Sequence, residues 1–235
     1  AHGGQAWQDA TVFEAVAMGI GGNNYYKNCY VDLKETCLRS ETTVKVFDQM
    51  RKLQGFTDEG SPGRDWNVAT GMVIEGKAGF QIMGDWAKGE FTAAGKVPGV
   101  DYYCAATPSN NGYLYNVDSF IFYKTSDPDK QEGQKLLAKL MMGKNFQKVF
   151  NLYKGSIPAR LDVPMDEFDK CAKTSNSDIK TAGASGGLVP SFAHGMAQGN
   201  TMKAALQDVI TEHFNSDMSS VDAANALADS VLDNM

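Results

Sequence analysis

The fold class is decided by residues 76–94, which have the sequence GKAGFQIMGDWAKGEFTAA. Apolar side chains alternate with other side chains over residues 78–82, and this alternation predicts a short strand. The pair Gly84-Asp85 then opens a predicted helix that continues to Ala94. A strand that leads directly into a helix is typical of α/β folds, in which ligands bind beyond the carboxyl ends of the strands. We therefore expect part of a binding site at this junction.

Helical patterns dominate the rest of the chain. The clearest covers residues 41–53, where Val44, Phe47 and Met50 share one face and Ser40 is a suitable N-cap. The other expected elements are a helix starting near residue 8, helices over residues 64–74, 128–142, 145–154, 164–174, 177–182, 200–214 and 219–232, and strands over residues 102–106 and 119–123. We therefore expect a helix-rich α/β fold with few strands and an incomplete sheet.

Apolar stretches are short throughout the chain. The longest, at residues 11–20 and 136–142, are too short and too interrupted to span a bilayer. The second belongs to the expected helix after Asp127, which is a suitable N-cap. Its buried stripe is expected to consist of Leu136, Leu137, Leu140 and Met141.

The net charge excludes several classes of partner. The chain has 22 Lys and Arg residues against 28 Asp and Glu residues, a formal charge of -6. Phosphate backbones and anionic lipids attract basic surfaces, so neither nucleic acid nor a membrane surface is expected as a partner. Residues 1–5 have neither the basic start nor the apolar stretch of a signal peptide, so we expect a mature form or a fragment.

The four cysteines do not predict a metal site. Cys29, Cys37, Cys104 and Cys171 form no CxxC pair and have no histidine at metal-ligand spacing. No metal and no cofactor is therefore expected. An even number of cysteines fits disulfides in an oxidising compartment, and spacing alone leaves all three pairings open.

Six side chains have the chemistry that sugar recognition requires. Aromatic faces cover the C–H faces of a pyranose, and charged or amide groups bind its hydroxyls, which must keep hydrogen bonds when buried. The six candidates, on loops or at the ends of predicted elements, are Trp66, Trp86, Asn116, Asp118, Lys154 and His194. Each also has a structural interpretation, because tryptophans often lie in the core, aspartates order turns and lysines are usually solvated.

Two other functions compete with sugar binding. Asp85, Glu90 and Asp118 could supply the carboxylate pair of a glycosidase, with His194 as a base. The sequence does not define the separation of these groups, and it has no nucleophile elbow, phosphate loop or metal motif. We therefore rank catalysis below binding and expect no catalytic residue. The third interpretation is a structural fragment that binds nothing.

Four stretches resemble a known family. They are GGQAWQ at residues 3–8, GKAGFQIMGDW at residues 76–86, NVDSF at residues 116–120 and KGSIPAR at residues 154–160. They resemble the family 1 extracellular solute-binding proteins of ABC sugar importers, and most closely the periplasmic glucose/mannose-binding members. The resemblance extends over essentially the whole chain. It implies a periplasmic-binding-protein-like fold of type II, a monosaccharide such as glucose as ligand, and the membrane subunits of an ABC transporter as partners.

The same resemblance implies a role for each candidate. Trp66 and Trp86 would stack against the sugar or form a wall of its site. The polar groups that would bind its hydroxyls are Asn116, Asp118, Lys154 and His194. The resemblance also implies a disulfide between Cys104 and Cys171, which leaves Cys29 and Cys37 as a second pair.

The chain differs from this family in its length. Members of the family are much longer, so residues 1–235 are expected to be the C-terminal portion of a two-lobed protein. This portion would comprise one main lobe, hinge-crossing segments and terminal helices, with the N-terminal lobe absent. We therefore expect weakened sugar binding, and self-association through the apolar and strand-edge surface that the other lobe would cover.

Overall fold

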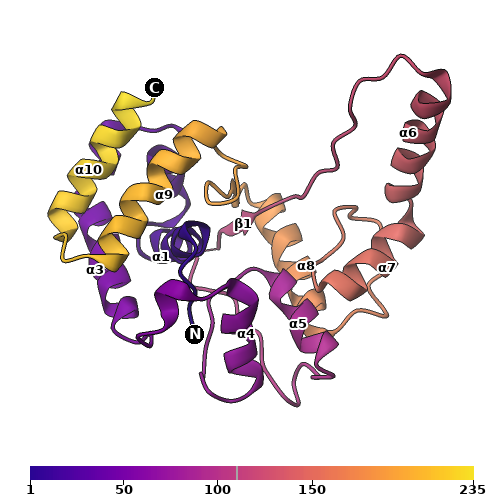
Figure 1. The fold of residues 1–235 in the computed structure, drawn as a ribbon, viewed down its shortest axis with the longest axis horizontal. Coiled ribbons are helices and arrows are strands. Elements are labelled where there is room, and N and C mark those ends of the chain that lie inside the picture. The colour runs from indigo at the N-terminus through magenta and orange to yellow at the C-terminus, as the bar shows by residue number, and fades with distance from the viewer. Residues whose placement is uncertain (110) are drawn as a thin grey trace.

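The computed structural model describes residues 1–109 and 111–235 and consists mainly of helices joined by loops (Figure 1). The elements in chain order are α1 (Ala6–Tyr26), the π-helical turn η1 (Lys27–Val31), α2 (Glu35–Leu38), α3 (Glu41–Gln54), the 3-10 turn η2 (Ser61–Gly63), α4 (Trp66–Ile74), the 3-10 turn η3 (Asp85–Ala87), α5 (Lys88–Ala93), β1 (Tyr113–Tyr115), α6 (Pro128–Met141), α7 (Lys144–Lys154), α8 (Lys170–Ala184), β2 (Leu188–Pro190), α9 (Asn200–Asn215) and α10 (Ser220–Asp233). None of the described helices is both long enough and apolar enough to cross a membrane.

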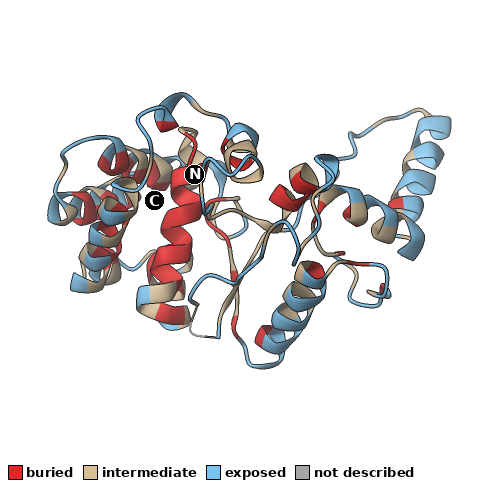
Figure 2. Cartoon of the chain, turned by 90° about the horizontal axis from the view of Figure 1, so that it is seen from below, coloured by how far each residue is buried: buried red, intermediate tan, exposed pale blue. Residues whose placement is uncertain are grey.

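The main core surrounds α1. This helix packs against α3 and α9, and α10 packs against α9 and α3 (Figures 1 and 2). Every residue of α1 from Gln8 to Met18 is buried, so the helix forms the centre of the body. Its Phe13 ring lies 4.9 Å from the Phe47 ring of α3. Such aromatic pairs add to the free energy gained by burying apolar area.

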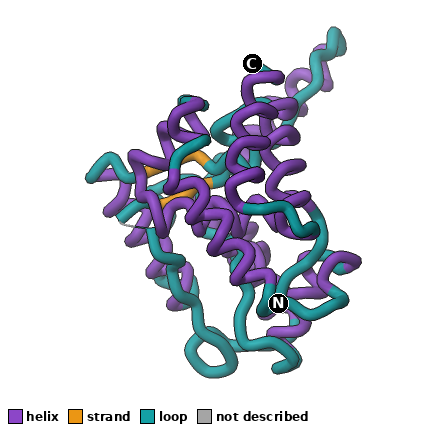
Figure 3. The backbone as a smooth tube through the Cα atoms, turned by 90° about the vertical axis from the view of Figure 1, so that its left-hand side faces the viewer, coloured by secondary structure: helices purple, strands orange, loops and turns teal. Residues whose placement is uncertain are grey.

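The sheet has only two short parallel strands in the described part of the chain. Leu114 of β1 lies opposite Val189 of β2, and helices surround the pair (Figure 3). The strands expected over residues 78–82, 102–106 and 119–123 are not formed, apart from an isolated bridge at Tyr102. A strand is defined by backbone hydrogen bonds to a neighbour, and these segments do not form such a ladder. The predicted α/β class with many helices and few strands is confirmed, whereas the predicted strand positions are wrong.

Most predicted helices are confirmed. Ser40 caps α3 by accepting a hydrogen bond from the Thr43 N–H, and Asp127 caps α6 in the same way. The helix expected over residues 164–174 is wrong in its start, because Asp169 caps α8 and the helix begins only at Lys170. This helix then continues to Ala184, without the break that the sequence predicted.

Helix α6 projects from the body on the extended segment before it, with α7 as its main neighbour (Figure 1). Met141 is buried, but the side chains of Leu136, Leu137 and Leu140 are 59%, 48% and 61% exposed. The expected buried stripe is therefore wrong for three of its four members. A helix buries a stripe only where another element covers it, and this face of α6 has no such cover among the described residues.

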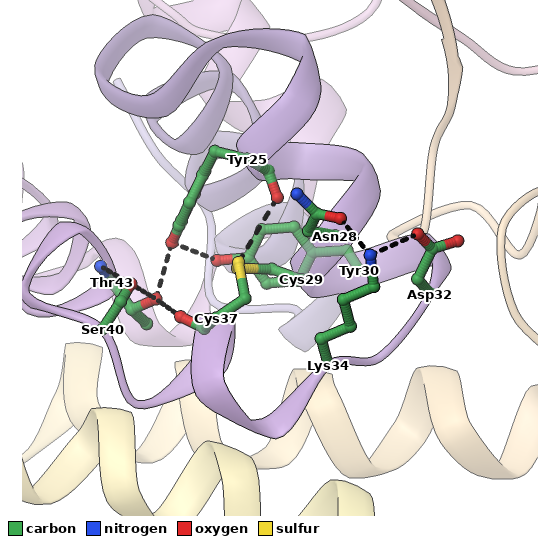
Figure 4. The surroundings of a disulfide bond; sticks show 9 residues. All are labelled: Tyr25, Asn28, Cys29, Tyr30, Asp32, Lys34, Cys37, Ser40 and Thr43. Carbon is green, nitrogen blue, oxygen red and sulfur yellow. Dashed lines mark hydrogen bonds and ion pairs between the residues drawn. A yellow bond between two sulfur atoms is a disulfide. The ribbon is translucent and has the colours of Figure 1, made fainter.

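Two disulfides join parts of the chain. Cys29 of η1 is bonded to Cys37 of α2. Nearby, the Tyr25 hydroxyl shares hydrogen bonds with the hydroxyls of Tyr30 and Thr43 (Figure 4). The second disulfide, Cys104–Cys171, ties the segment before β1 to the first turn of α8. The Cys104–Cys171 bond has the pairing that the sequence resemblance implied, and Cys29–Cys37 is the pair that then remained.

Candidate functional site

The candidate side chains lie at the ends of elements. Asn116 directly follows β1, and His194 follows β2 after a short interval. The two strands are parallel, so their carboxyl ends lie at the same edge of the sheet. Lys154 is the last residue of α7, and Trp86 lies in the turn η3. The fold therefore brings residues that are far apart in sequence to one edge.

The polar side of the site is a connected group. The Asn116 amide donates a hydrogen bond to Asp118 Oδ1 at 3.3 Å, and the Lys154 ammonium forms an ion pair with Asp118 Oδ2. The hydrogen bond from Lys154 lowers the pKa of Asp118 below its usual value, against the effect of partial burial.

The aromatic side of the site consists of three rings. The Trp86 and His194 rings meet edge to face with centroids 5.0 Å apart. Trp7, at the start of α1, lies 6.0 Å from the His194 ring and 6.5 Å from the Trp86 ring. Trp7 was not among the residues predicted for the site, although it belongs to the GGQAWQ stretch that carried the family resemblance. Its indole is the aromatic group that sequence reasoning missed.

Two glycines allow these side chains to come close together. A Cβ atom added at Gly84 would lie 2.1 Å from the Trp86 ring, so this ring folds back over Gly84 and a larger residue there would displace it. Gly155 ends α7 with a φ of +92°, and a Cβ atom there would lie 2.6 Å from the Gly89 backbone nitrogen. The end of α7, with Lys154, can therefore pack directly against α5.

Trp66 is the first residue of α4 and is held through its backbone. Its backbone N–H donates to Gln5 Oε1 at 3.4 Å, and its carbonyl accepts from Gln81 Nε2 at 3.2 Å. These bonds place it beside the segment that leads into Trp7. In the part of the chain that the structure describes, however, no ring contact joins Trp66 to Trp86 or His194.

Lys154 also borders an apolar face of α7. Its ammonium lies 5.8 Å from the centre of the Phe150 ring, in the range of a cation–π contact. A shallow, open depression at this place is also lined by Phe146, Val149 and Tyr153. This surface has almost no groups for hydroxyls, so the polar function of Lys154 lies with Asp118.

The carboxylates of the enzymatic alternative have different environments. Burial raises the pKa of Asp85, although Asp85 Oδ2 also accepts a hydrogen bond from the Ile157 N–H at 3.2 Å. Asp118, in contrast, has a lowered pKa. Glu90 lies on α5. Among the described residues, no group of three or more His, Cys, Asp or Glu side chains could hold a metal ion.

Comparison with known proteins assigns the chain to a family. Residues 2–209 match the family of bacterial extracellular solute-binding proteins, and the chain belongs to this family. The prediction made from the four stretches is thus confirmed. The names of several relatives also indicate the cellular compartment, because they describe periplasmic proteins. The protein is periplasmic, as predicted.

Two relatives and one solved structure illustrate this assignment. A protein of Brucella suis is 47% identical over 232 residues, which are 98% of this chain and 55% of the relative. A protein of Rhizobium meliloti is 45% identical over 232 residues, or 98% of this chain and 56% of the relative. Both are named probable sugar-binding periplasmic proteins, and the chain spans about half the length of these curated relatives.

The solved structure is a Streptococcus pneumoniae solute-binding protein in complex with the blood group A-trisaccharide. It superposes with a TM-score of 0.67 at 18% identity and covers 100% of this chain and 59% of that chain. At this level of identity the match shows a shared fold. The helix-rich solute-binding fold predicted from the sequence is therefore confirmed.

Proposed function

We propose that this chain binds a neutral monosaccharide, glucose or a similar aldohexose, for uptake by an ABC transporter. The observation that carries the proposal is that the ring pair of Trp86 and His194 and the polar group of Asn116, Asp118 and Lys154 both lie where the parallel strands β1 and β2 end. A pyranose needs an apolar wall for its C–H face and strong hydrogen-bonding groups for its hydroxyls. This arrangement offers both.

The charges of the site favour a neutral ligand. Asp118 and Lys154 form an ion pair, so their charges largely cancel. A ligand that carried a charge of its own would have to compete with one member of this pair. A hydroxyl, in contrast, can accept from the ammonium and donate to the carboxylate while both remain charged. The names of the relatives, which include sugar binding, support the same class of ligand.

The chain would supply one side of the binding site. We propose that it corresponds to the C-terminal portion of a two-lobed protein, with one main lobe, the hinge-crossing segments and the terminal helices. Its length relative to the Brucella suis protein supports this interpretation. Closure of two lobes favours the bound state because the ligand contacts both at once. This chain alone should therefore bind glucose more weakly than a full-length relative, whose partners would be the membrane subunits of the transporter.

A tryptophan fluorescence titration tests the proposal. Trp7 and Trp86 both contact His194, so a sugar that enters the site should change their emission. Glucose, galactose and mannose should give a saturable change that is lost in His194→Ala. A change that is the same in this variant, or no change with any hexose, would contradict the proposal and favour a structural fragment without a ligand.

One observation keeps the glycosidase alternative open. Asp85 has a raised pKa and Asp118 a lowered one, and two carboxyl groups with such different pKa values are what an acid and its partner need in glycoside hydrolysis. Asp85, however, is bound to the backbone of Ile157. Incubation with aryl glucosides decides the matter. We expect no sugar release, and release that is abolished in Asp118→Asn or Glu90→Gln would establish catalysis.

A further inference from the structure

A buried carboxylate lies behind His194 and is not part of the proposed sugar contacts. Glu14, in the middle of α1, is 3% exposed. Its oxygens accept hydrogen bonds from the Tyr26 hydroxyl at 3.0 Å and from the Ala193 N–H at 3.3 Å. The Ser191 hydroxyl lies 2.7 Å from Oε1 and 2.9 Å from Oε2 of the same group. Three donors around one buried carboxylate are the environment that an ionised group requires.

Ser191 connects this carboxylate to the imidazole. Its Oγ lies 2.9 Å from His194 Nδ1, and it also accepts the His194 backbone N–H at 3.1 Å. A serine hydroxyl has one proton to donate and two lone pairs to accept with. If its proton pointed at Nδ1, its oxygen would face an unprotonated carboxylate at 2.7 Å without a proton between them. The proton therefore lies toward Glu14, and one lone pair faces Nδ1.

The position of the Ser191 proton determines the tautomer of His194. A lone pair that faces Nδ1 at 2.9 Å requires a proton on Nδ1. A neutral imidazole then has a bare lone pair on Nε2. This Nε2 atom is buried and has no hydrogen-bond partner among the described residues. An unpaired buried acceptor is costly, and a donor that reaches it is correspondingly favoured.

We infer that Glu14 and Ser191 are positioning residues that hold His194 in the Nδ1–H tautomer, so that Nε2 accepts a hydrogen bond from one hydroxyl of the ligand. The second half of this inference rests on the proposed sugar binding, and the first half does not. His194 then selects a ligand group that can donate a proton. Because Nε2 is covered, the hydroxyl reaches it only when a covering side chain shifts, and the Trp86 ring packs directly against the imidazole.

Nitrogen NMR of the chain labelled with ¹⁵N-histidine tests the tautomer without any sugar. The His194 signals are identified by their loss in His194→Gln, and we expect the proton on Nδ1. In Ser191→Ala the preference for Nδ1–H should be lost. Tyr26→Phe is the matched control, because it removes a different donor from Glu14 and leaves the serine in place. A proton on Nε2 in the unmodified chain would overturn the inference, as would an equal change in both variants.

Sugar analogues test the acceptor role. A hydroxyl that donates to Nε2 can be replaced neither by hydrogen nor by fluorine, since fluorine cannot donate. At one ring position, deoxyglucose and deoxyfluoroglucose should therefore both bind about 2- to 10-fold more weakly than glucose, and this loss should vanish in His194→Ala. Retained binding of all fluoro analogues would overturn the acceptor role. An Nδ1–H tautomer without any sugar binding would contradict the proposed function and not the tautomer.

Discussion

Replacing Asp118 with asparagine should separate sugar binding from stability. The side chains of Asp118 and Lys154 are 61% and 28% exposed. An ion pair this exposed contributes at most about 1 kcal/mol to folding, so Asp118→Asn should lower the melting temperature only slightly. A hydrogen bond between a sugar hydroxyl and the charged carboxylate is stronger, at about 1.5–3 kcal/mol. Calorimetric titration should therefore show an affinity for glucose about 10- to 150-fold lower.

Asp162 provides a matched control for this prediction. It is 53% exposed and forms ion pairs with Arg160 at 2.8 Å and Lys144 at 3.0 Å, but it belongs to none of the site contacts described above. Asp162→Asn should lower stability by a similar small amount and leave the glucose affinity unchanged. The reasoning fails if Asp118→Asn binds glucose normally, or if both variants lose affinity equally.

The lowered pKa of Asp118 leads to a prediction about the pH dependence of binding. Its pKa is lowered in the folded protein by the hydrogen bond from Lys154. A carboxylate with a lowered pKa remains ionised as pH falls to the usual aspartate pKa of about 3.9 and is protonated only below it. Glucose affinity should therefore not change with Asp118 ionisation between neutral pH and about pH 4. A loss that Asp118→Asn removes, at a pH well above 4, would contradict this assignment.

Three further predictions concern stability and assembly. The Cys104–Cys171 disulfide closes a loop with a sequence separation of 67, and the Cys29–Cys37 disulfide closes one with a separation of 8. Denaturant unfolding should therefore show that Cys104→Ser lowers the free energy of unfolding by about 4 kcal/mol and Cys29→Ser by about 2.5 kcal/mol. Equal losses would refute the loop-length argument. Burial lowers the pKa of His213 to about 4, so below about pH 6.5 the unfolded chain binds more protons than the folded one. The free energy of unfolding should therefore fall by up to about 3 kcal/mol as pH drops toward 4. Thermal melts should show a smaller pH dependence in His213→Leu. The exposed leucines of α6 should promote self-association, which light scattering over a concentration series should detect. The double substitution Leu136→Lys with Leu140→Lys should reduce this association. A monomer at all concentrations would contradict the prediction.

Helices were predictable from the sequence because their signals are local. The face formed by Phe47 and Met50, and the caps Ser40 and Asp127, lie within a few residues of the helices that they define. Strands depend on partners that are distant in the chain. Residues 119–123 have the composition of a strand, yet no neighbouring strand pairs with them in the described structure, and the side chain of Ile121 is 77% exposed.

The site was predictable only in part. The family resemblance supplied Asn116, Asp118 and Lys154, and the structure brings them together. Trp66 has backbone contacts to Gln5 and Gln81, and its role against the sugar stays a prediction. The support behind His194 was not predictable, because Glu14 and Ser191 are separated by 177 positions in sequence. The local signal of such a network is an acidic residue, Glu14, among the apolar side chains of α1.

Calorimetric titration of the unmodified chain with D-glucose tests the central claim most directly. The account predicts saturable binding with one site per chain, weaker than that of a full-length relative, and no such heat with a charged sugar such as glucuronate. Absence of saturable heat with glucose, galactose and mannose at millimolar concentrations would contradict the claim that this chain carries a binding site for a neutral hexose.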